Sequence, residues 1–229
     1  MRIRSRIPAV LILPLLLAGC LFGGGDKDAQ PPARIAPRAS GPVSLPAQPS
    51  AETKQCYSDL GRDRIEYRTL ADRDYGGGCL VVGAVQLLDI GVPIANLKSM
   101  RCPLARAFTG WVRNGVAPAA LQILGSELVR VESMGTYSCR GIVGGGSGSA
   151  GRISQHGLAN AVDVAVFVLR DGRRVSIEGG WNGSDRERAF LRAIRQSACK
   201  RFTTVLSPDY NSAHYNHLHL DLGGKAFCR

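Results

Sequence analysis

The sequence contains no Cys-x-x-Cys pair, although seven of its 229 residues are cysteines. This absence argues against a thiolate zinc site and against a dithiol redox motif. No internal repeat is visible along the chain. Histidine is scarce, and all four histidines fall within two short segments, residues 154–163 and residues 214–219. Any histidine chemistry therefore belongs to those two segments.

The N-terminus has the composition of a secretory signal peptide over residues 1–19. Arg2, Arg4 and Arg6 form a basic start, and residues 9–18 are almost wholly apolar. The apolar run is too short for a membrane-spanning helix. We therefore expect the rest of the chain to be exported.

The end of this segment, Leu17-Ala18-Gly19-Cys20, resembles the bacterial lipoprotein box, in which the cysteine becomes the acylated first residue. The alternative is a signal peptide that happens to contain a cysteine. Leu21, rather than an aspartate, follows Cys20, and by resemblance to Gram-negative lipoproteins this favours the outer membrane. The expectation is a periplasmic protein anchored to that membrane by a lipid on Cys20.

Residues 20–52 are expected to form the lipidated N-terminus and a flexible tether. Three consecutive glycines, Gly23 to Gly25, and a proline-rich run over residues 31–49 leave few large apolar residues to bury. Such a segment cannot offset the entropy lost on ordering. The remaining residues 53–229 suffice for one domain with a real core.

The expected domain keeps six cysteines once Cys20 is set aside. An even number of scattered cysteines in an exported chain predicts three disulfides. Six cysteines allow fifteen pairings, and the sequence alone does not choose between them. Pairing of neighbours along the chain is the working hypothesis, giving Cys56–Cys79, Cys102–Cys139 and Cys199–Cys228.

The formal charge of +11 falls to about +8 when the three arginines of the signal are removed, because residues 1–19 carry no acidic side chain. A basic exported domain is drawn to anionic polymers, and cell wall or lipid headgroups fit this compartment. Nucleic acid is not an expected partner there. The basic residues are spread along the chain, so a solvated surface and a binding patch remain equal alternatives.

The apolar pattern predicts an α+β domain with a small, largely antiparallel sheet flanked by helices. Pro103 suits the first turn of one helix, and Asn114-Gly115 is expected to end it. Ser184 and Glu187 match a capping box at the start of another helix. The expected helices are 103–114, 118–124 and 185–198, and the expected strands or buried segments are 79–88, 128–131, 161–169, 174–177, 202–206 and 217–222.

The histidine segments and Asp163 can supply two imidazoles and one carboxylate, the ligand set of a catalytic zinc ion that keeps one position open for water. The other two histidines are left for proton transfer or charge stabilisation. The glycine-rich run 144–149 closely precedes the first segment. It is either a mobile rim of this site or a plain connector.

Geometry constrains the first segment. His156 and Asp163 are seven positions apart, which corresponds to about 10.5 Å along a helix or roughly 23 Å along a straight strand. Ligands of one zinc ion lie about 2 Å from it, so the chain must fold back between them. Gly157 can supply the bend, because glycine tolerates a positive φ.

Asp163 would then lie in a strand among small and apolar side chains. Its own face carries Ala161 and Ala165, and the opposite face carries Val162, Val164 and Val166. A carboxylate in these surroundings is costly unless it is paired or bound to a metal ion.

The second segment is simpler. In a strand, His217, His219 and Asp221 point to one face, while Leu218 and Leu220 point to the other face, toward the core. One histidine can ligate a metal ion while its neighbour, about 7 Å along the strand, borders the same water. A His-x-His pattern alone is weak evidence for a metal site, and the first segment strengthens it.

The pattern Ser154-x-His156-(six residues)-Asp163 followed by His217-x-His219 resembles the zinc peptidase superfamily of D-alanyl-D-alanine peptidases, lysostaphin-type enzymes and hedgehog domains. The spacing His214-x-x-His217-x-His219 is similar to that of the penicillin-insensitive murein endopeptidases. Over residues 55–229 the chain resembles the bacterial extensin-like C-terminal domain family. The features that carry this wider resemblance are Cys102-Pro103-Leu104-Ala105, Tyr137-Ser138-Cys139-Arg140, residues 154–163, Phe167 and the terminal histidine run.

The resemblance implies a hedgehog-like or D-Ala-D-Ala peptidase-like fold and a zinc ion held by His156, Asp163 and His219. It also implies that His217 is the general base or stabilises the transition state. His214 would lie nearby and assist it.

Three further residues receive supporting roles by the same resemblance. Arg140 is similar to an arginine that steadies the oxyanion or the substrate carboxylate in relatives, and its alternative is a surface charge beside a disulfide. Ser154 either supports a ligand through a hydrogen bond or caps a turn. Asp221 is a candidate for orienting His219.

The sequence departs from these relatives at two positions. Relatives commonly have glycine where Ala159 stands, whereas the glycine here is Gly157, so the bend is expected to differ. The dipeptidase branch has a glutamate where this chain has Asn216. Catalysis would therefore rest on the histidines, which favours an endopeptidase-like activity over a D-Ala-D-Ala dipeptidase.

These observations lead to the hypothesis of a zinc metallopeptidase, a peptidoglycan endopeptidase or carboxypeptidase, that hydrolyses an amide bond in stem peptides or cross-links. The protein would be a monomer whose partners are peptidoglycan and, through its lipid, the membrane. The alternative is an inactive envelope-structural lipoprotein that binds cell wall, since hedgehog domains show that the scaffold can serve recognition. A complete ligand set with a candidate base favours the enzyme. Metal storage fits a single site with an open position poorly.

Overall fold

The computed structural model describes residues 44–45, 48–144 and 147–229. All of them fall in one unit of the chain, Ile35–Arg229. The expected signal peptide, Cys20 and most of the expected tether lie outside the described residues. Helix α1 (Ala51–Arg62) begins before residue 53, so the last residues assigned to the tether belong to this helix. None of the helices in the described ranges is long and apolar enough to cross a membrane.

The main sheet has the strand order β12-β10-β11-β8-β7-β5, and β9 also pairs with β8. Four of its six neighbouring pairs are antiparallel, and the pairs β10–β12 and β5–β7 are parallel, so the predicted α+β class with a largely antiparallel sheet is confirmed. The strands are β5 (Ile94–Ala95), β7 (Leu128–Gly135), β8 (Ala161–Leu169), β9 (Arg174–Ser176), β10 (Thr204–Leu206), β11 (Leu218–Asp221) and β12 (Phe227–Cys228).

Two smaller sheets extend the fold. Strands β1 (Glu66–Thr69), β4 (Ala84–Asp89) and β6 (Met100–Arg101) form one, and the hairpin of β2 (Arg73–Asp74) and β3 (Leu80–Val81) forms the other. The expected strand 79–88 is therefore two strands. Gly83, at a φ of 61°, separates them, because this positive φ interrupts the extended backbone.

Helix α2 (Cys102–Trp111) does not end at Asn114-Gly115 as predicted. Helical backbone continues through a π-turn (Val112–Val116), α3 (Ala117–Ala119) and a second π-turn (Ala120–Leu124), and stops at Gly125 with a φ of 72°. Gly115 serves packing instead. A Cβ at this position would lie 2.5 Å from the Ser197 hydroxyl oxygen of helix α5 (Asp185–Cys199), so only glycine permits this close approach.

Helix α5 begins as predicted. The Ser184 side chain accepts from the backbone N–H of Glu187, and the Glu187 carboxylate accepts from the backbone N–H of Ser184, which completes the capping box. Its inner face carries Phe190, Leu191 and Ile194, all fully buried. A short helix, α4 (Ile177–Gly180), precedes it.

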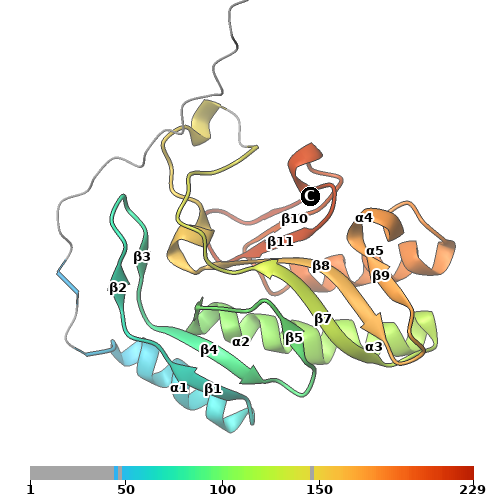
Figure 1. The fold of residues 1–229 in the computed structure, drawn as a ribbon, viewed down its shortest axis with the longest axis horizontal. Helices are drawn as coiled ribbons and strands as arrows, with labels where there is room; N and C mark the ends of the chain where they lie inside the picture. Colours follow the sequence, from blue (N-terminus) through green and yellow to red (C-terminus); the bar gives the residue numbers. More distant parts are fainter. Residues whose placement is uncertain (1–43, 46–47, 145–146) are drawn as a thin grey trace, which may run out of the picture. The chain divides into compact units, whose positions relative to one another are not determined.

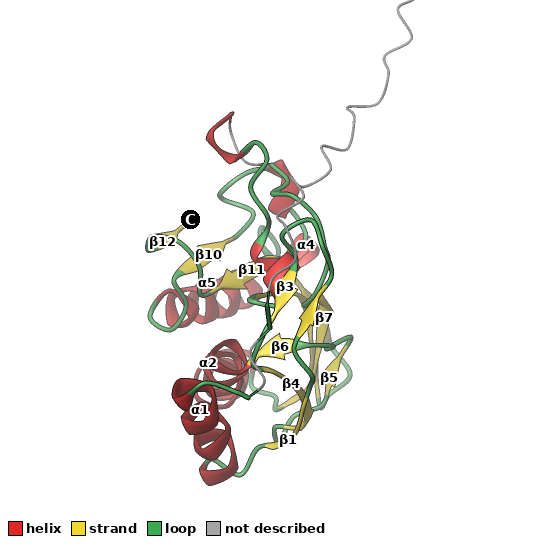
Figure 2. Ribbon diagram, turned by 90° about the vertical axis from the view of Figure 1, so that its left-hand side faces the viewer, coloured by secondary structure: helices red, strands yellow, loops and turns green. Residues whose placement is uncertain are grey.

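The helices cover one face of the sheet. Figures 1 and 2 both place α1, α2 and α5 on the same side of the strands. The core lies between these layers and is centred on Trp111, whose ring lies 6.2 Å from that of Phe167 on β8 and 6.3 Å from that of Phe202. Its indole N–H donates to the Ile194 carbonyl oxygen at 2.9 Å, so even the polar atom of this buried ring is satisfied.

Strand β8 changes the side chains that it presents to the core along its length. Val162 and Val164 are buried in the core, as regular alternation requires. The next buried side chain is that of Phe167, and Val166 is only partly buried. Ala165 is the extra residue, because Ser133 pairs with Val164 and Glu132 pairs with Val166. This bulge reverses the alternation of the strand. The prediction that Val166 shares a face with Val162 is therefore wrong.

The disulfides differ from the predicted pairing in two of three cases. The predicted Cys56–Cys79 and Cys102–Cys139 are wrong, because the bridges are Cys56–Cys102 and Cys79–Cys139. The predicted Cys199–Cys228 is present.

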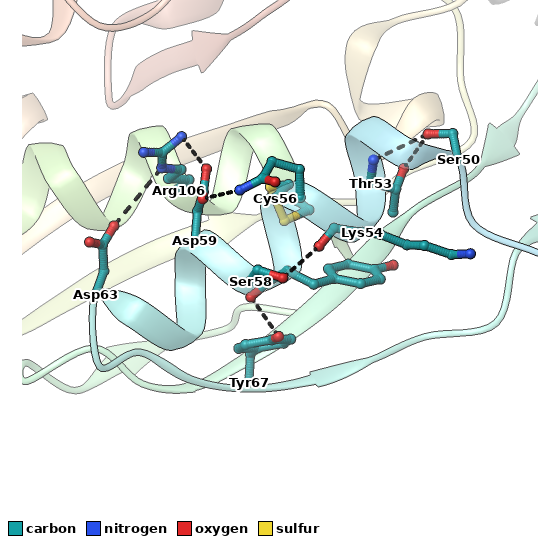
Figure 3. Close-up of a disulfide and its surroundings, with 12 residues drawn as sticks. Ser50, Thr53, Lys54, Cys56, Ser58, Asp59, Asp63, Tyr67 and Arg106 are labelled. Atoms are coloured by element: carbon teal, nitrogen blue, oxygen red, sulfur yellow. Dashed lines mark hydrogen bonds and ion pairs between the residues drawn. A yellow bond between two sulfur atoms is a disulfide. The ribbon is translucent and has the colours of Figure 1, made fainter.

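The packing explains this exchange of partners. Cys56 lies on α1, which packs along α2, so it meets the first residue of α2 (Figure 3). Beside it, Arg106 of α2 forms an ion pair with Asp59 of α1 at 2.8 Å. Cys79 instead directly precedes β3 and is bridged to Cys139 in the segment after β7.

Candidate metal centre

Two neighbouring strands carry the centre of the site. Asp163 on β8 and His219 on β11 are direct partners in an antiparallel register. Their neighbours in the strands, Val162, Val164, Leu218 and Leu220, are fully buried in the core. Because alternate residues of a strand face opposite sides, Asp163 and His219 lie on the face that the helices leave uncovered.

His156 reaches the same place from a 3₁₀ turn, Gln155–Leu158. The hydroxyl of Ser154 accepts a hydrogen bond from the backbone N–H of His156 at 3.3 Å, so Ser154 caps this turn. The chain then reverses toward β8.

The reversal is made by Ala159, not by Gly157 as predicted. Ala159 is in the left-handed conformation, with a φ of 50°, and it ends the turn. Gly157 has no positive φ, and its missing side chain serves close packing. A Cβ there would lie 2.7 Å from the Ile153 Cγ2 atom and 3.0 Å from the Cys79 sulfur. The prediction correctly placed a bend here but assigned it to the wrong residue.

Three side chains, those of His156, Asp163 and His219, converge. The His156 Nε2 atom lies 3.1 Å from an Asp163 oxygen and 3.2 Å from the His219 Nδ1 atom. His219 Nδ1 lies 3.0 Å from the other Asp163 oxygen. Donors at about 2.0–2.1 Å from a tetrahedral zinc ion are about 3.3–3.4 Å apart, so the three side chains are nearly at ligand spacing.

The hydrogen bonds that His156 and His219 make on the side away from Asp163 decide whether their inner nitrogens, His156 Nε2 and His219 Nδ1, carry a proton or a lone pair. His156 Nδ1 lies 3.0 Å from the Thr136 carbonyl oxygen, which can only accept, so Nδ1 donates its N–H and neutral His156 keeps a lone pair on Nε2. His219 Nε2 lies 2.8 Å from an Asp221 oxygen, and the same reasoning leaves the lone pair of the neutral ring on Nδ1. Two lone pairs and a carboxylate therefore face one another and call for a cation, in the arrangement found behind metal-binding histidines.

The electrostatics agree with a site built for positive charge. Burial lowers the pKa of His219, but hydrogen bonds and charge from Asp163 and Asp221 outweigh it and raise the pKa to about 9. Burial raises the pKa of Asp163, but hydrogen bonds from His156 and His219 outweigh it and hold the pKa well below its usual range. In the metal-free protein, a proton on His219 thus supplies the positive charge that the cluster attracts.

Two more histidines border this cluster. His217 Nε2 lies 3.6 Å from an Asp163 oxygen, and the rings of His214 and His217 are 5.1 Å apart between centroids. The His217 Nδ1 atom lies 2.9 Å from the Asn216 side-chain oxygen, and the His214 Nδ1 atom lies 2.7 Å from the Asn211 side-chain oxygen. Donation from each Nδ1 leaves both Nε2 atoms free to accept a proton.

Both histidines are held neutral at physiological pH. Burial is the main cause that lowers the pKa of His214, and the charges of His217 and His219 lower it further, to about 4. Burial is also the main cause that lowers the pKa of His217. A neutral imidazole next to a cation site has the protonation state that a general base requires.

An open cleft of about 600 Å³ leads to the cluster. Arg140, half-buried, lines it and its charge contributes to the lowered pKa of His214 and His217. Ser149 of the glycine-rich run also lines the cleft, and the Gly144 carbonyl accepts from Asn211 at 3.0 Å, while residues 145–146 of that run lie outside the described residues. A larger groove of about 1010 Å³ lies between α1 and α2, away from the described histidines.

The structure thus brings together all residues that the sequence placed in the site. Asp221 accepts from His219, and Ser154 caps the turn of His156. Sequence reasoning missed Thr136 and Asn211, and it did not foresee that Asn216 accepts from His217. Thr136 acts through its backbone carbonyl, which leaves no sequence signal, whereas an asparagine three positions before His214 and another next to His217 were visible as hydrogen-bonding neighbours.

Comparison with known proteins gives one match. No curated protein and no solved structure matches the chain. The family described as "Extensin-like protein C-terminus" matches residues 54–229, which include every described residue of the histidine cluster and all three disulfides. The chain belongs to the extensin-like C-terminal family.

Proposed function

We propose that this protein is a zinc-dependent peptidoglycan hydrolase that cleaves an amide bond in stem peptides or cross-links. The observation that carries the proposal is the convergence of the inner nitrogens of His156 and His219 with the Asp163 carboxylate at 3.0–3.2 Å. The proposal also places the domain in the zinc peptidase superfamily of D-alanyl-D-alanine peptidases, lysostaphin-type enzymes and hedgehog domains, because of the order and spacing of these ligands.

The residues around the cluster fit amide hydrolysis. When bound, zinc would supply a Lewis acid that polarises the scissile carbonyl and acidifies a water molecule. His217, neutral and with Nε2 facing the cluster, would take the proton from that water and pass it to the leaving amine. His214 would hold His217 in place from the side, and the Arg140 guanidinium would attract the developing negative charge in the cleft.

The substrate class and the location rest on other features of the sequence. The signal-like N-terminus and the lipoprotein-box resemblance at Cys20 support export and a lipid anchor at the outer membrane. Peptidoglycan is the abundant amide-containing polymer within reach of such an anchor, and a net positive charge suits its carboxylates. If this is right, Cys20→Ser moves the protein from the membrane fraction to the soluble periplasmic fraction, and an unchanged distribution would contradict the lipid anchor.

Digestion of purified sacculi tests the activity. Wild-type protein should release new muropeptides, and His219→Ala or a metal chelator should abolish their release. Re-addition of zinc should restore release to the chelated wild type only. Identical muropeptide profiles for the wild type and His219→Ala would defeat the proposal.

A second variant separates the chemistry from metal binding. His217→Ala should keep the zinc ion, because His156, Asp163 and His219 are intact, but should slow hydrolysis by about 10²- to 10⁴-fold, the usual contribution of a general base. Arg170→Ala, which changes an exposed side chain away from the cleft, is the matched control. Sacculus binding without any release of product by the wild type would favour an inactive wall-binding protein instead.

A further inference from the structure

The segment that follows β7 is bonded closely to the turn that carries His156. The Ser138 N–H donates to the His156 carbonyl oxygen at 3.2 Å, and the Ser154 N–H donates to the Arg140 carbonyl oxygen at 3.0 Å. The Thr136 carbonyl oxygen accepts from the His156 ring at 3.0 Å. Both the backbone and the imidazole orientation of His156 therefore depend on where residues 136–140 lie.

The main sheet does not fix this segment, because β7 ends at Gly135. Besides the hydrogen bonds to the turn, a covalent link holds it. Cys139 lies within the segment and is bridged to Cys79, the fully buried residue before β3. The Cys79 sulfur also lies against the turn itself, since it would be 3.0 Å from a Cβ on Gly157, the residue after His156.

We propose that the Cys79–Cys139 disulfide is a positioning device for the metal ligand His156, an inference that rests on the proposed zinc site. With the bridge intact, residues 136–140 hold the Thr136 carbonyl against His156 Nδ1, which fixes the tautomer and aims Nε2 at Asp163 and His219. Without the bridge, only non-covalent contacts, such as that of the Tyr75 and Tyr137 rings at 4.8 Å, join this segment and the turn to the hairpin of β2 and β3. Binding of the metal ion then has to order His156, and this reduces the affinity of the site for the ion.

A second disulfide provides a matched control. Cys56–Cys102 joins α1 to α2, and its 46-residue separation is close to the 60 residues of Cys79–Cys139, so its loss should destabilise the folded chain to a similar extent. Arg101, next to Cys102, donates its N–H to the Ala159 carbonyl oxygen at 2.8 Å. The pairing of Arg101 with Ala84 between β6 and β4 holds that contact independently of the bridge.

The test compares Cys79→Ser/Cys139→Ser with Cys56→Ser/Cys102→Ser in the full chain, purified in detergent. Zinc affinity is measured by competition with a chromophoric chelator. The first double variant should bind zinc about 10- to 100-fold more weakly than the wild type, the loss usually seen when a partner behind a metal ligand is removed. The second should bind zinc as the wild type does, despite a similar drop in Tm. Equal zinc affinities in the two double variants would overturn the proposal.

Hydrogen exchange in the metal-free proteins gives a readout that does not depend on zinc. The amides of Ser138 and Ser154 should exchange faster in Cys79→Ser/Cys139→Ser but not in Cys56→Ser/Cys102→Ser. Unchanged exchange of these amides would overturn the positioning role even if both variants bind zinc weakly. A wild type that binds no zinc but shows the expected exchange pattern would defeat the proposed function alone.

A third variant leaves all disulfides in place, in case the cysteine variants do not fold. Gly157→Ala puts a methyl group against the Cys79 sulfur and Ile153, and so displaces the turn from the bridge. It should weaken zinc binding severalfold. Gly61→Ala, on α1 with no atom within 4 Å of the added methyl group, is the control and should leave zinc affinity unchanged. Unchanged affinity in Gly157→Ala would contradict the proposal.

Discussion

Two carboxylates on the same face of the sheet have different environments and different expected roles. Asp163 faces His156 Nε2 and His219 Nδ1, as expected of the proposed ligand. Asp221 lies behind His219, accepts from its outer nitrogen at 2.8 Å, and accepts from the Gly223 N–H at 2.7 Å. Asp221 is therefore bound on both oxygens before any metal ion arrives, which fits a residue that fixes the ring of a ligand.

Asp221→Ala should weaken zinc binding about 10- to 100-fold without removing a ligand, because the His219 ring loses the partner that fixes its tautomer. Competition with a chelator measures this change. Asp185→Ala, where the replaced side chain is 92% exposed, is the control and should bind zinc normally. Equal affinities for the two variants would exclude Asp221 from the support of the site.

His214 and His219 should titrate at very different pH values in the metal-free protein. NMR should find one ring titrating near pH 9, which His219→Ala removes, and one near pH 4, which His214→Ala removes. Because the folded-state pKa of His219 is above the unfolded value of about 6.5, its stabilising contribution is complete below that pH and is lost as the pH rises toward 9.

His214 acts in the opposite direction. Its pKa is lower in the folded state than in the unfolded state, so it destabilises the fold progressively as the pH falls from about 6.5 toward 4. Zinc should abolish the titration near pH 9, since a metal ion and a proton compete for the same His219 nitrogen. His214 and His219 rings that both titrate near the ordinary histidine pKa of about 6.5 would contradict the buried arrangement.

At the level of elements, local signals predicted what depends on neighbours along the chain. The capping box at Ser184 starts α5 as expected, and strands β8 and β11 lie within the segments predicted for them. Signals whose meaning depends on packing led to wrong predictions. Gly115 has the sequence of a helix end, but it is a contact point with Ser197, and the helical backbone continues to Leu124.

Ser184→Ala tests the capping box separately from the site. Loss of the cap should reduce the free energy of unfolding by about 1 kcal/mol, because it leaves the Glu187 N–H without its partner. Denaturant unfolding measures this change. Zinc affinity should not change, since α5 packs on the face of the sheet opposite the histidine cluster. A stability equal to that of the wild type would show that the cap contributes nothing.

The bulge at Ala165 could not be predicted from the alternation of side chains. A regular strand would place Val166 with Val162 in the core, whereas the two-to-one register against β7 brings Phe167 inward to Trp111. The gain is the burial of a large aromatic ring, which outweighs that of a valine. Whether Val166 or Phe167 faces the core depends on strand β7 and on the helices that cover this face of the sheet.

At the scale of the whole molecule, the sequence singled out the candidate ligands, but not the contacts between distant segments that support them. The resemblance to the zinc peptidase superfamily implied His156, Asp163 and His219, and the structure brings these three side chains together. The disulfide partners depend on which segments meet in space, and neighbouring cysteines along the chain were assigned wrongly for that reason. The bend between His156 and Asp163 was assigned to Gly157 rather than Ala159, because a positive φ of 50° is unusual for alanine.

The hydrophobic core and the candidate site lie on opposite faces of the main sheet. Helices α2 and α5 and the aromatic cluster around Trp111 cover one face of the main sheet (Figures 1 and 2), while the opposite face carries Asp163, His219 and the cleft. Substitutions on the uncovered face should therefore change metal binding more than folding.

The zinc content of the purified protein tests the central claim most directly. After reconstitution with zinc and removal of the excess, elemental analysis should find one zinc ion per wild-type molecule, and close to none in the His156→Ala/His219→Ala variant. Arg170→Ala should retain one zinc ion. A folded wild type that retains no more zinc than the double variant would contradict the account.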